Sequence, residues 1–193
     1  MISAFLELLR DKLAEDWKPV GRPALIAWLV FYALFLLYLL RAGGGFTLFD
    51  NVNLVVHEAG HAFFGWFGPT IGIMGGTIMQ LLVPLLLCVS FVWQRHTSGA
   101  AFCAFVFFEN FLYVATYMAD ARARALPLVT LGDPDNAEHD FFRIFSQFGV
   151  LQHDTQIAAV VRFLGWAGMV AAVAWLAWRA TRSASPALSA STR

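Results

Sequence analysis

The sequence predicts an all-α, polytopic membrane protein, a bundle of about five transmembrane helices preceded by an amphipathic helix. The 193 residues are 59% hydrophobic and only 13% charged, whereas about a quarter of the residues of a typical soluble domain are charged. Several apolar segments are also long enough to cross the roughly 30 Å of hydrocarbon in a bilayer. We therefore expect one transmembrane domain at residues 1–182, in contact with the lipid bilayer.

Proline, glycine and polar clusters divide the apolar sequence into segments. Pro23 is suited to open the first span, and the run Gly43-Gly44-Gly45 to end it. Thr47, followed three residues later by Asp50, resembles a capping box and predicts the start of a second helix that stops before Pro69. Further spans are expected at residues 70–93, 98–119 and 158–178, and the first at 24–40.

The two ends of the chain differ from this pattern. Residues 1–21 place Leu6, Leu9, Leu13 and Trp17 on one helical face among charged residues, which predicts a helix lying at the membrane interface, with a soluble partner as the alternative. Residues 183–193 are rich in serine and alanine and are expected to be disordered.

If five segments span the membrane, the distribution of basic residues only weakly predicts the orientation of the chain. With a cytoplasmic N-terminus, seven basic residues then lie inside and five outside. A re-entrant segment at residues 70–84 would change this count.

No basic cluster is interleaved with aromatic residues, so the sequence gives no support for nucleic-acid binding. Cys88 and Cys103 lie in apolar runs and are expected to be buried as small apolar residues.

The motif His57-Glu58-Ala-Gly-His61 lies within the second hydrophobic helix. Residues four apart stack on one helical face, so His57 and His61 can bind one metal ion, with Glu58 as the general base. Two histidines and a carboxylate favour zinc, and we expect one Zn²⁺ per chain. Three ionisable residues inside an apolar helix are costly, which argues against a purely structural polar cluster.

Other polar residues fall on neighbouring segments. Asn53 lies one turn before His57, where it is suited to accept the ring N–H of a metal-bound histidine. Four residues, Asn53, Gln80, Asn110 and Tyr113, are expected to position the substrate or to support the metal ligands, and to line a polar cavity around the metal. The pair Gly75-Gly76 has two interpretations, a substrate backbone lying against the helix or close packing of helices through small residues.

These motifs resemble the site-2 protease class of intramembrane zinc metallopeptidases, in particular the small bacterial membrane proteins grouped as peptidase M50-like. The resemblance rests on the HEAGH motif, on Gly75-Gly76-Thr77 and Gln80 to Pro84, and on Asn110 to Asp120. It implies that Asp120 is the third metal ligand and that Asn110 positions the substrate. It also implies an integral protein of the bacterial inner (cytoplasmic) membrane.

The chain departs from the family pattern, in which a leucine and a glycine flank the aspartate, because Asp120 is followed by Ala121. The polar segment 121–156 supplies rivals for the third ligand, namely His139 and Asp140, and Glu109 is a further option by its depth in the membrane. A loop of this length usually has a function, and His139-Asp140 are read either as a helix start or as part of a lid over the metal.

Two functions remain open at this stage. The first is a zinc metalloprotease that hydrolyses a peptide bond in or near a transmembrane segment of a membrane-protein substrate, with Glu58 activating a zinc-bound water. The second is a non-proteolytic membrane protein that uses the same residues as a structural metal site or to transport metal ions or protons.

Overall fold

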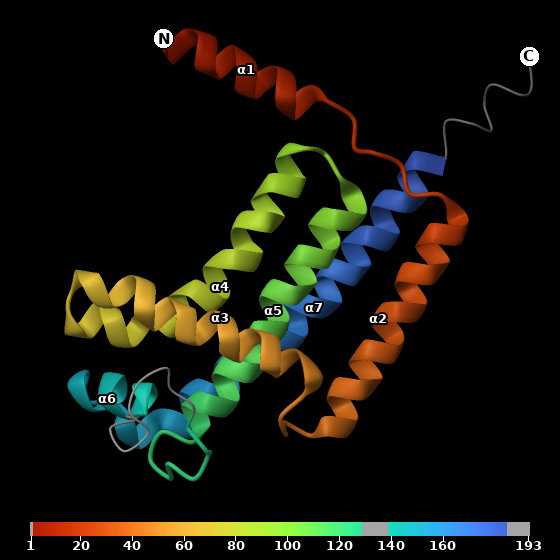
Figure 1. Cartoon of the computed structure of the whole chain (residues 1–193). Helices are drawn as coiled ribbons and strands as arrows, with labels where there is room; N and C mark the ends of the chain where they lie inside the picture. Colours follow the sequence, from red (N-terminus) through yellow and green to blue (C-terminus); the bar gives the residue numbers. More distant parts are fainter. Residues whose placement is uncertain (1, 129–138, 185–193) are drawn as a thin grey trace, which may run out of the picture.

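The computed structural model describes residues 2–128 and 139–184, and every regular element in these ranges is helical (Figure 1). The expected all-α fold class is therefore confirmed for the described part of the chain. The elements are α1 (Ile2–Ala14), α2 (Arg22–Ala42), α3 (Leu48–Phe64), the 3-10 turn η1 (Gly65–Phe67), α4 (Pro69–Trp93), α5 (Thr97–Ala119), α6 (Asp140–Gln147), η3 (Leu151–His153) and α7 (Asp154–Ala184).

Four of these helices are long and apolar enough to cross a membrane: α2, α4, α5 and α7. Large apolar side chains such as Leu34 and Leu37 of α2 are more than half exposed, as expected for surfaces that face lipid. The motif-bearing helix α3 is not among the four. Its 17 residues extend about 25 Å, and Figure 1 shows it running across the direction of α2, α5 and α7. The expected number of five spans is therefore not confirmed.

The first span ends where the glycine run predicts. Pro23 lies in the first turn of α2, and Gly43 follows the helix with a left-handed φ of 58°. Its backbone N–H donates to the carbonyl of Leu40, so the chain leaves the helix with one of the terminal carbonyls satisfied. Asp50 then accepts a hydrogen bond from the backbone N–H of Thr47 and fixes the start of α3.

The centre of the bundle is built by α2, α5 and α7. Tyr32, Phe105 and Met169, one from each helix, are almost fully buried in a single apolar cluster. Gly168 of α7 lies against the ring of Phe108, so closely that an added Cβ would overlap the ring. Small residues allow such close approach of membrane helices, and α5 and α7 consequently form a rigid frame beside which the motif is placed.

Helices α3 and α4 form a tight hairpin through glycines. A Cβ on Gly60 would collide with the carbonyl oxygen of Gly75, and a Cβ on Gly75 would lie 2.6 Å from Cβ of Phe64. The two backbones therefore touch at this crossing. Of the two interpretations of Gly75, the structure shows the close packing of helices. Residues 70–84, for which the sequence also allows a re-entrant segment, form the first part of α4 in this hairpin.

The basic residues divide unequally between the two ends of the bundle. Figure 1 shows that the start of α2, the α4–α5 connection and the end of α7 lie at the same end of the bundle as α1. This end carries Arg10, Lys12, Lys18, Arg22, Arg95, Arg179 and Arg182, whereas the connections at the other end carry Arg41, Arg122, Arg124 and Arg143. If α2, α4, α5 and α7 span a membrane, the excess of positive charge predicts that the end with α1 faces the cytoplasm and that α6 lies on the opposite side.

This orientation is tested by labelling single cysteines in intact bacterial cells with a membrane-impermeant maleimide. In a chain whose Cys88 and Cys103 are replaced by alanine, we expect Arg124→Cys to be labelled and Gln94→Cys to be protected until the cells are lysed. Both positions are exposed and lie at opposite ends of the bundle. Labelling of Gln94→Cys alone would reverse the orientation.

Candidate metal centre

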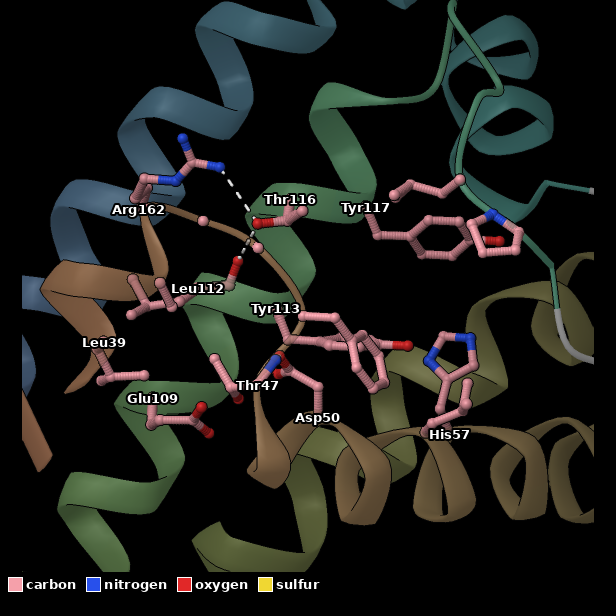
Figure 2. A pocket seen from close by; sticks show the side chains of 18 of the residues that line it. Leu39, Thr47, Asp50, His57, Glu109, Leu112, Tyr113, Thr116, Tyr117 and Arg162 are labelled. Carbon is pink, nitrogen blue, oxygen red and sulfur yellow. Dashed lines mark hydrogen bonds between the residues drawn. The ribbon is translucent and has the colours of Figure 1, made fainter.

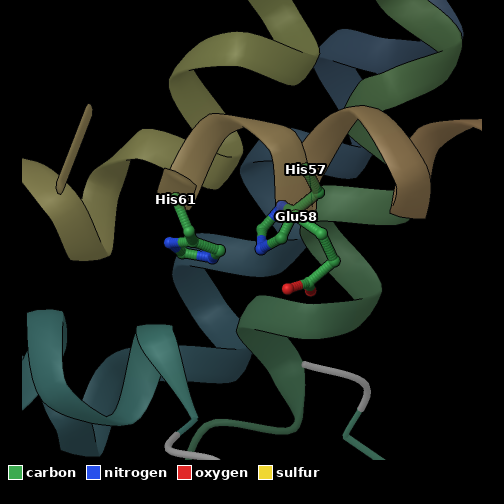
Figure 3. A group of neighbouring side chains, drawn as sticks. All are labelled: His57, Glu58 and His61. Atoms are coloured by element: carbon green, nitrogen blue, oxygen red, sulfur yellow. The ribbon is translucent and has the colours of Figure 1, made fainter. Parts of the chain in front are cut away.

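The three motif side chains project from the same side of α3 (Figure 3). His57, Glu58 and His61 each offer a possible ligand atom, and these atoms all lie within 4.8 Å of one another. The imidazole of His57 is buried, whereas Glu58 and His61 are partly exposed. The spacing of one helical turn thus produces the cluster that the motif predicts.

Helix α4 fixes the orientation of both imidazole rings. Nδ1 of His61 lies 2.8 Å from the carbonyl oxygen of Gly72, and Nδ1 of His57 lies 3.2 Å from Oε1 of Gln80. A Cβ on Gly76 would lie 2.5 Å from Nε2 of His57 and 2.6 Å from Nε2 of His61. The absence of a side chain at Gly76 therefore leaves the space that the two rings occupy.

A carboxylate from α6 meets the two histidines. Oδ2 of Asp140 lies 2.9 Å from Nε2 of His57 and 3.1 Å from Nε2 of His61. Ligand atoms around a tetrahedral zinc ion are about 3.3 to 3.6 Å apart for bonds of about 2.0 to 2.2 Å. The two distances from Oδ2 of Asp140 are thus a few tenths of an ångström shorter than those between zinc ligands, and the three residues are of types that zinc prefers.

The hydrogen bonds of the rings explain why this meeting point favours a cation. The carbonyl oxygen of Gly72 can only accept, so the hydrogen of a neutral His61 ring is on Nδ1. Nε2 of His61 then presents a lone pair to an oxygen of Asp140, which is also an acceptor. Such an arrangement is repulsive unless a metal ion lies at the meeting point or the ring is doubly protonated.

Several contacts around Asp140 hold it in place. The backbone N–H of Asp140 donates to the phenol oxygen of Tyr117 over 3.1 Å, and the ring of Tyr117 lies over that of His139 at a centroid distance of 4.2 Å. Nδ1 of His139 accepts from the N–H of Phe142 and caps α6. Phe141 and Phe145 anchor the same helix in an apolar cluster with Val114 of α5.

The charges of α6 follow from these contacts. Burial raises the pKa of Asp140, but the contacts with His57 and His61 outweigh burial and hold the pKa below its usual range. Burial lowers the pKa of His139 below its usual value, against the attraction of Asp120 and Asp140. Asp140 is therefore ionised and His139 neutral near neutral pH.

The structure does not place Asp120, the ligand that the family resemblance implies, at the histidines. Its two carboxylate oxygens accept hydrogen bonds from the backbone N–H groups of Ala125 and Leu126, and Oδ2 lies 3.4 Å from Nε2 of His139. Asp120 thus stabilises the turn after α5 and faces the helix cap. Of the rivals, His139 caps α6, and Asp140 is the residue that contacts both histidines.

Of the other predicted polar residues, Gln80 faces the site and Asn53 does not contact a histidine. Oε1 of Gln80 lies 3.2 Å from Nδ1 of His57, as expected of a residue that supports a candidate ligand, whereas Asn53 donates to Oε2 of Glu109 over 3.2 Å. Asn110 is buried and donates to the carbonyl of Val106 on its own helix. Of the four residues expected to line the cavity, only Tyr113 does so, and its ring lies 6.4 Å from that of His57.

A cavity of about 1040 Å³ adjoins the cluster (Figure 2). Its walls come from the end of α2, the glycine loop, α3, α5, the segment after α5 and α7, and they include Glu58, His61, Glu109, Tyr113, Asp140 and Arg162. This volume is at the upper end of the range of about 300 to 1,000 Å³ for ligand pockets. The candidate metal centre therefore opens into a space large enough for part of a peptide.

Three contributors to the site were not predicted from the sequence. The carbonyl of Gly72 carries no sequence signal, because any residue provides one. The contact of Tyr117 with Asp140 was also not predicted, although Asn110, Tyr113 and Tyr117 recur every three to four residues and so predict a polar helical face toward the metal. The need for space at Gly76 appears only when the histidine rings are placed against α4.

Comparison of the chain with protein-family models, with curated proteins and with solved structures found no match.

Replacing Gly76 by alanine is expected to weaken zinc binding at least tenfold, because the new methyl group would occupy the space of both imidazole rings. Zinc affinity of the detergent-purified protein, measured by competition with a chelating dye, tests this. Gly65→Ala is the matched control, because an added Cβ there meets nothing within 4 Å. Equal affinities of the two variants would contradict the placement of the rings.

Substitutions of the two aspartates separate the candidates for the third ligand. Asp140→Asn should lower the zinc affinity by about tenfold or more, because it removes the charge that faces both histidines. Asp120→Asn should retain the metal, since the amide oxygen still accepts one of the two backbone N–H groups. Elemental analysis measures the zinc content of each variant, and dye competition measures its zinc affinity. Loss of zinc only from Asp120→Asn would instead support Asp120, the ligand that the resemblance implies.

Proposed function

We propose that the protein is an intramembrane zinc metalloprotease, which hydrolyses a peptide bond in or near a transmembrane segment of a membrane-protein substrate. The observation that carries this proposal is the convergence of three ligand-type atoms, Nε2 of His57, Nε2 of His61 and Oδ2 of Asp140, beside the carboxylate of Glu58. Three protein ligands with a fourth position left open is the arrangement of catalytic zinc sites, whereas structural zinc sites are closed by four protein ligands.

Zinc bound by these residues supplies a water of lowered pKa and polarises the carbonyl of the scissile bond. Glu58 accepts the proton of the attacking water and delivers it to the nitrogen of the leaving amine as the C–N bond breaks. Gln80 and the carbonyl of Gly72 hold the imidazole rings in the tautomer that leaves Nε2 available for the metal.

The arrangement of the surrounding helices also supports the proposal that the substrate is a membrane protein. The cluster opens into a large cavity, and this cavity lies within a helical bundle that has four helices apolar enough to span a membrane. Polar and charged walls at Glu58, Glu109 and Arg162 allow water to enter this part of the bundle. Hydrolysis requires both an extended substrate and water, and the cavity has room for both.

Glu58→Gln provides the test. The variant should retain about one zinc per chain but lose cleavage by a factor of about 100 or more, because an amide cannot accept the proton. We would reconstitute the protein in liposomes with membrane proteins of the producing host and identify new N-termini by mass spectrometry. Glu15→Gln, the same chemical change at an exposed position of the N-terminal segment, is the control.

Cleavage that survives in Glu58→Gln would exclude this mechanism. Zinc binding without any cleavage by the wild type would favour the second function, a structural or transport site for metal ions or protons.

A further inference from the structure

The last helix, α7, carries an arginine, Arg162, that lines the cavity beside the candidate metal centre. Arg162 lies eight residues after the start of α7 at Asp154, about 12 Å along the helix axis. It is the one Lys or Arg residue within the candidate span between His153 and Trp178. The 31 residues of α7 extend about 46 Å, more than a span needs, and Arg162 lies beside Gly44 of the loop that ends the first span.

The described residues give Arg162 a single neutral partner. Its Nη2 donates to Oγ1 of Thr116 over 3.3 Å, and the hydroxyl of Thr116 in turn donates to the carbonyl of Leu112 (Figure 2). None of the ion pairs found among residues 2–128 and 139–184 includes Arg162. A guanidinium has five N–H donors, so one hydroxyl leaves most of them available.

The carboxylates that line the same cavity have other contacts. Asp140 contacts the two histidines, Glu109 accepts from Asn53, and Asp50 accepts from Thr47. Glu58, the fourth carboxylate of this wall, also has an interaction of its own. Among the described residues, no ion pair joins any of the four to Arg162. The positive charge of Arg162 is therefore left for a group that comes from outside the described chain.

The surroundings of Arg162 indicate the kind of group. Trp166, Leu112 and Leu39 provide apolar walls of the cavity, and Gly44 faces the guanidinium, with Nη2 4.0 Å from the position of a Cβ. Figure 2 shows Arg162 on the α7 wall and His57 on the α3 wall. A ligand with an apolar body and an anionic group matches these walls, and the planar guanidinium fork matches a carboxylate in particular.

We propose that Arg162 forms a carboxylate-binding subsite of the cavity, which holds an acidic group of an apolar peptide while the rest of the peptide extends toward the histidines. This inference deepens the proposed protease function and names the chemistry of its substrate. Peptide carboxylates are favoured over lipid phosphates because the cavity that contains Arg162 also contains the candidate metal centre.

The test measures binding to chelator-treated, metal-free protein in phosphatidylcholine nanodiscs, so that hydrolysis and carboxylate binding to a metal play no part. The probes are an acetylated pentapeptide of leucine and alanine with a free C-terminal carboxylate and the same peptide with a C-terminal amide. We expect the wild type to bind the free acid roughly tenfold or more tighter than the amide, as a charged hydrogen-bonded pair provides. Arg162→Met should bind both peptides equally.

Two further variants support the interpretation. Arg162→Lys keeps the charge without the fork and should retain only part of the preference for the free acid. Arg182→Met removes an arginine that lies over Trp178, 4.5 Å from the ring centroid, at the far end of α7, and should keep the full preference. If Arg162→Met fails to fold, as judged by its thermal unfolding, Arg162→Lys carries the comparison.

Three results would overturn the proposal: equal binding of the two peptides by the wild type, no binding of either, or an unchanged preference in Arg162→Met. Co-purified phosphatidylglycerol that is lost only in Arg162→Met, together with equal binding of the peptides, would assign the arginine to a lipid phosphate. Because no metal is present, these outcomes are independent of whether the zinc-loaded protein cleaves a substrate.

Discussion

The backbone contact between α3 and α4 is the constraint on which the candidate metal centre depends. Gly60 and Gly75 let the two helices touch, and this closeness brings the carbonyl of Gly72 and the side chain of Gln80 within reach of the histidine rings. Without this contact the two imidazoles would keep their helical spacing but not their tautomers or their common direction. The metal-ligating geometry is therefore a property of the hairpin and not of the motif helix alone.

The local features of this fold could be predicted from the sequence. The end of α2 at the glycine run, the start of α3 at Thr47 and the four long apolar helices follow from residue types within one or two helical turns. The facing arrangement of His57, Glu58 and His61 is also local, since it requires only a helix. Such features depend on short-range periodicity and hydrogen bonding, which a single sequence displays directly.

The features that could not be predicted depend on contacts between distant segments. The sequence offered Asp120, His139 and Asp140 for the same role, and only the docking of α6 through Tyr117 and Phe141 shows which of them reaches the histidines. The direction of α3 is likewise set by its glycine contact with α4. The resemblance to a known class pointed to the end of α5, where Asp120 instead binds the backbone of the following turn.

The distance along the chain between the ligands has a consequence for biosynthesis. Asp140 follows His57 by 83 residues, and α4 and α5 are made between them. A nascent chain that has already inserted both histidines still lacks the carboxylate that neutralises a bound cation. For the proposed zinc site, stable capture of a metal would therefore wait until α6 has been translated and has docked on α5. A chain interrupted before that point would carry the motif without Asp140, so the proposed centre would be incomplete in a prematurely terminated product.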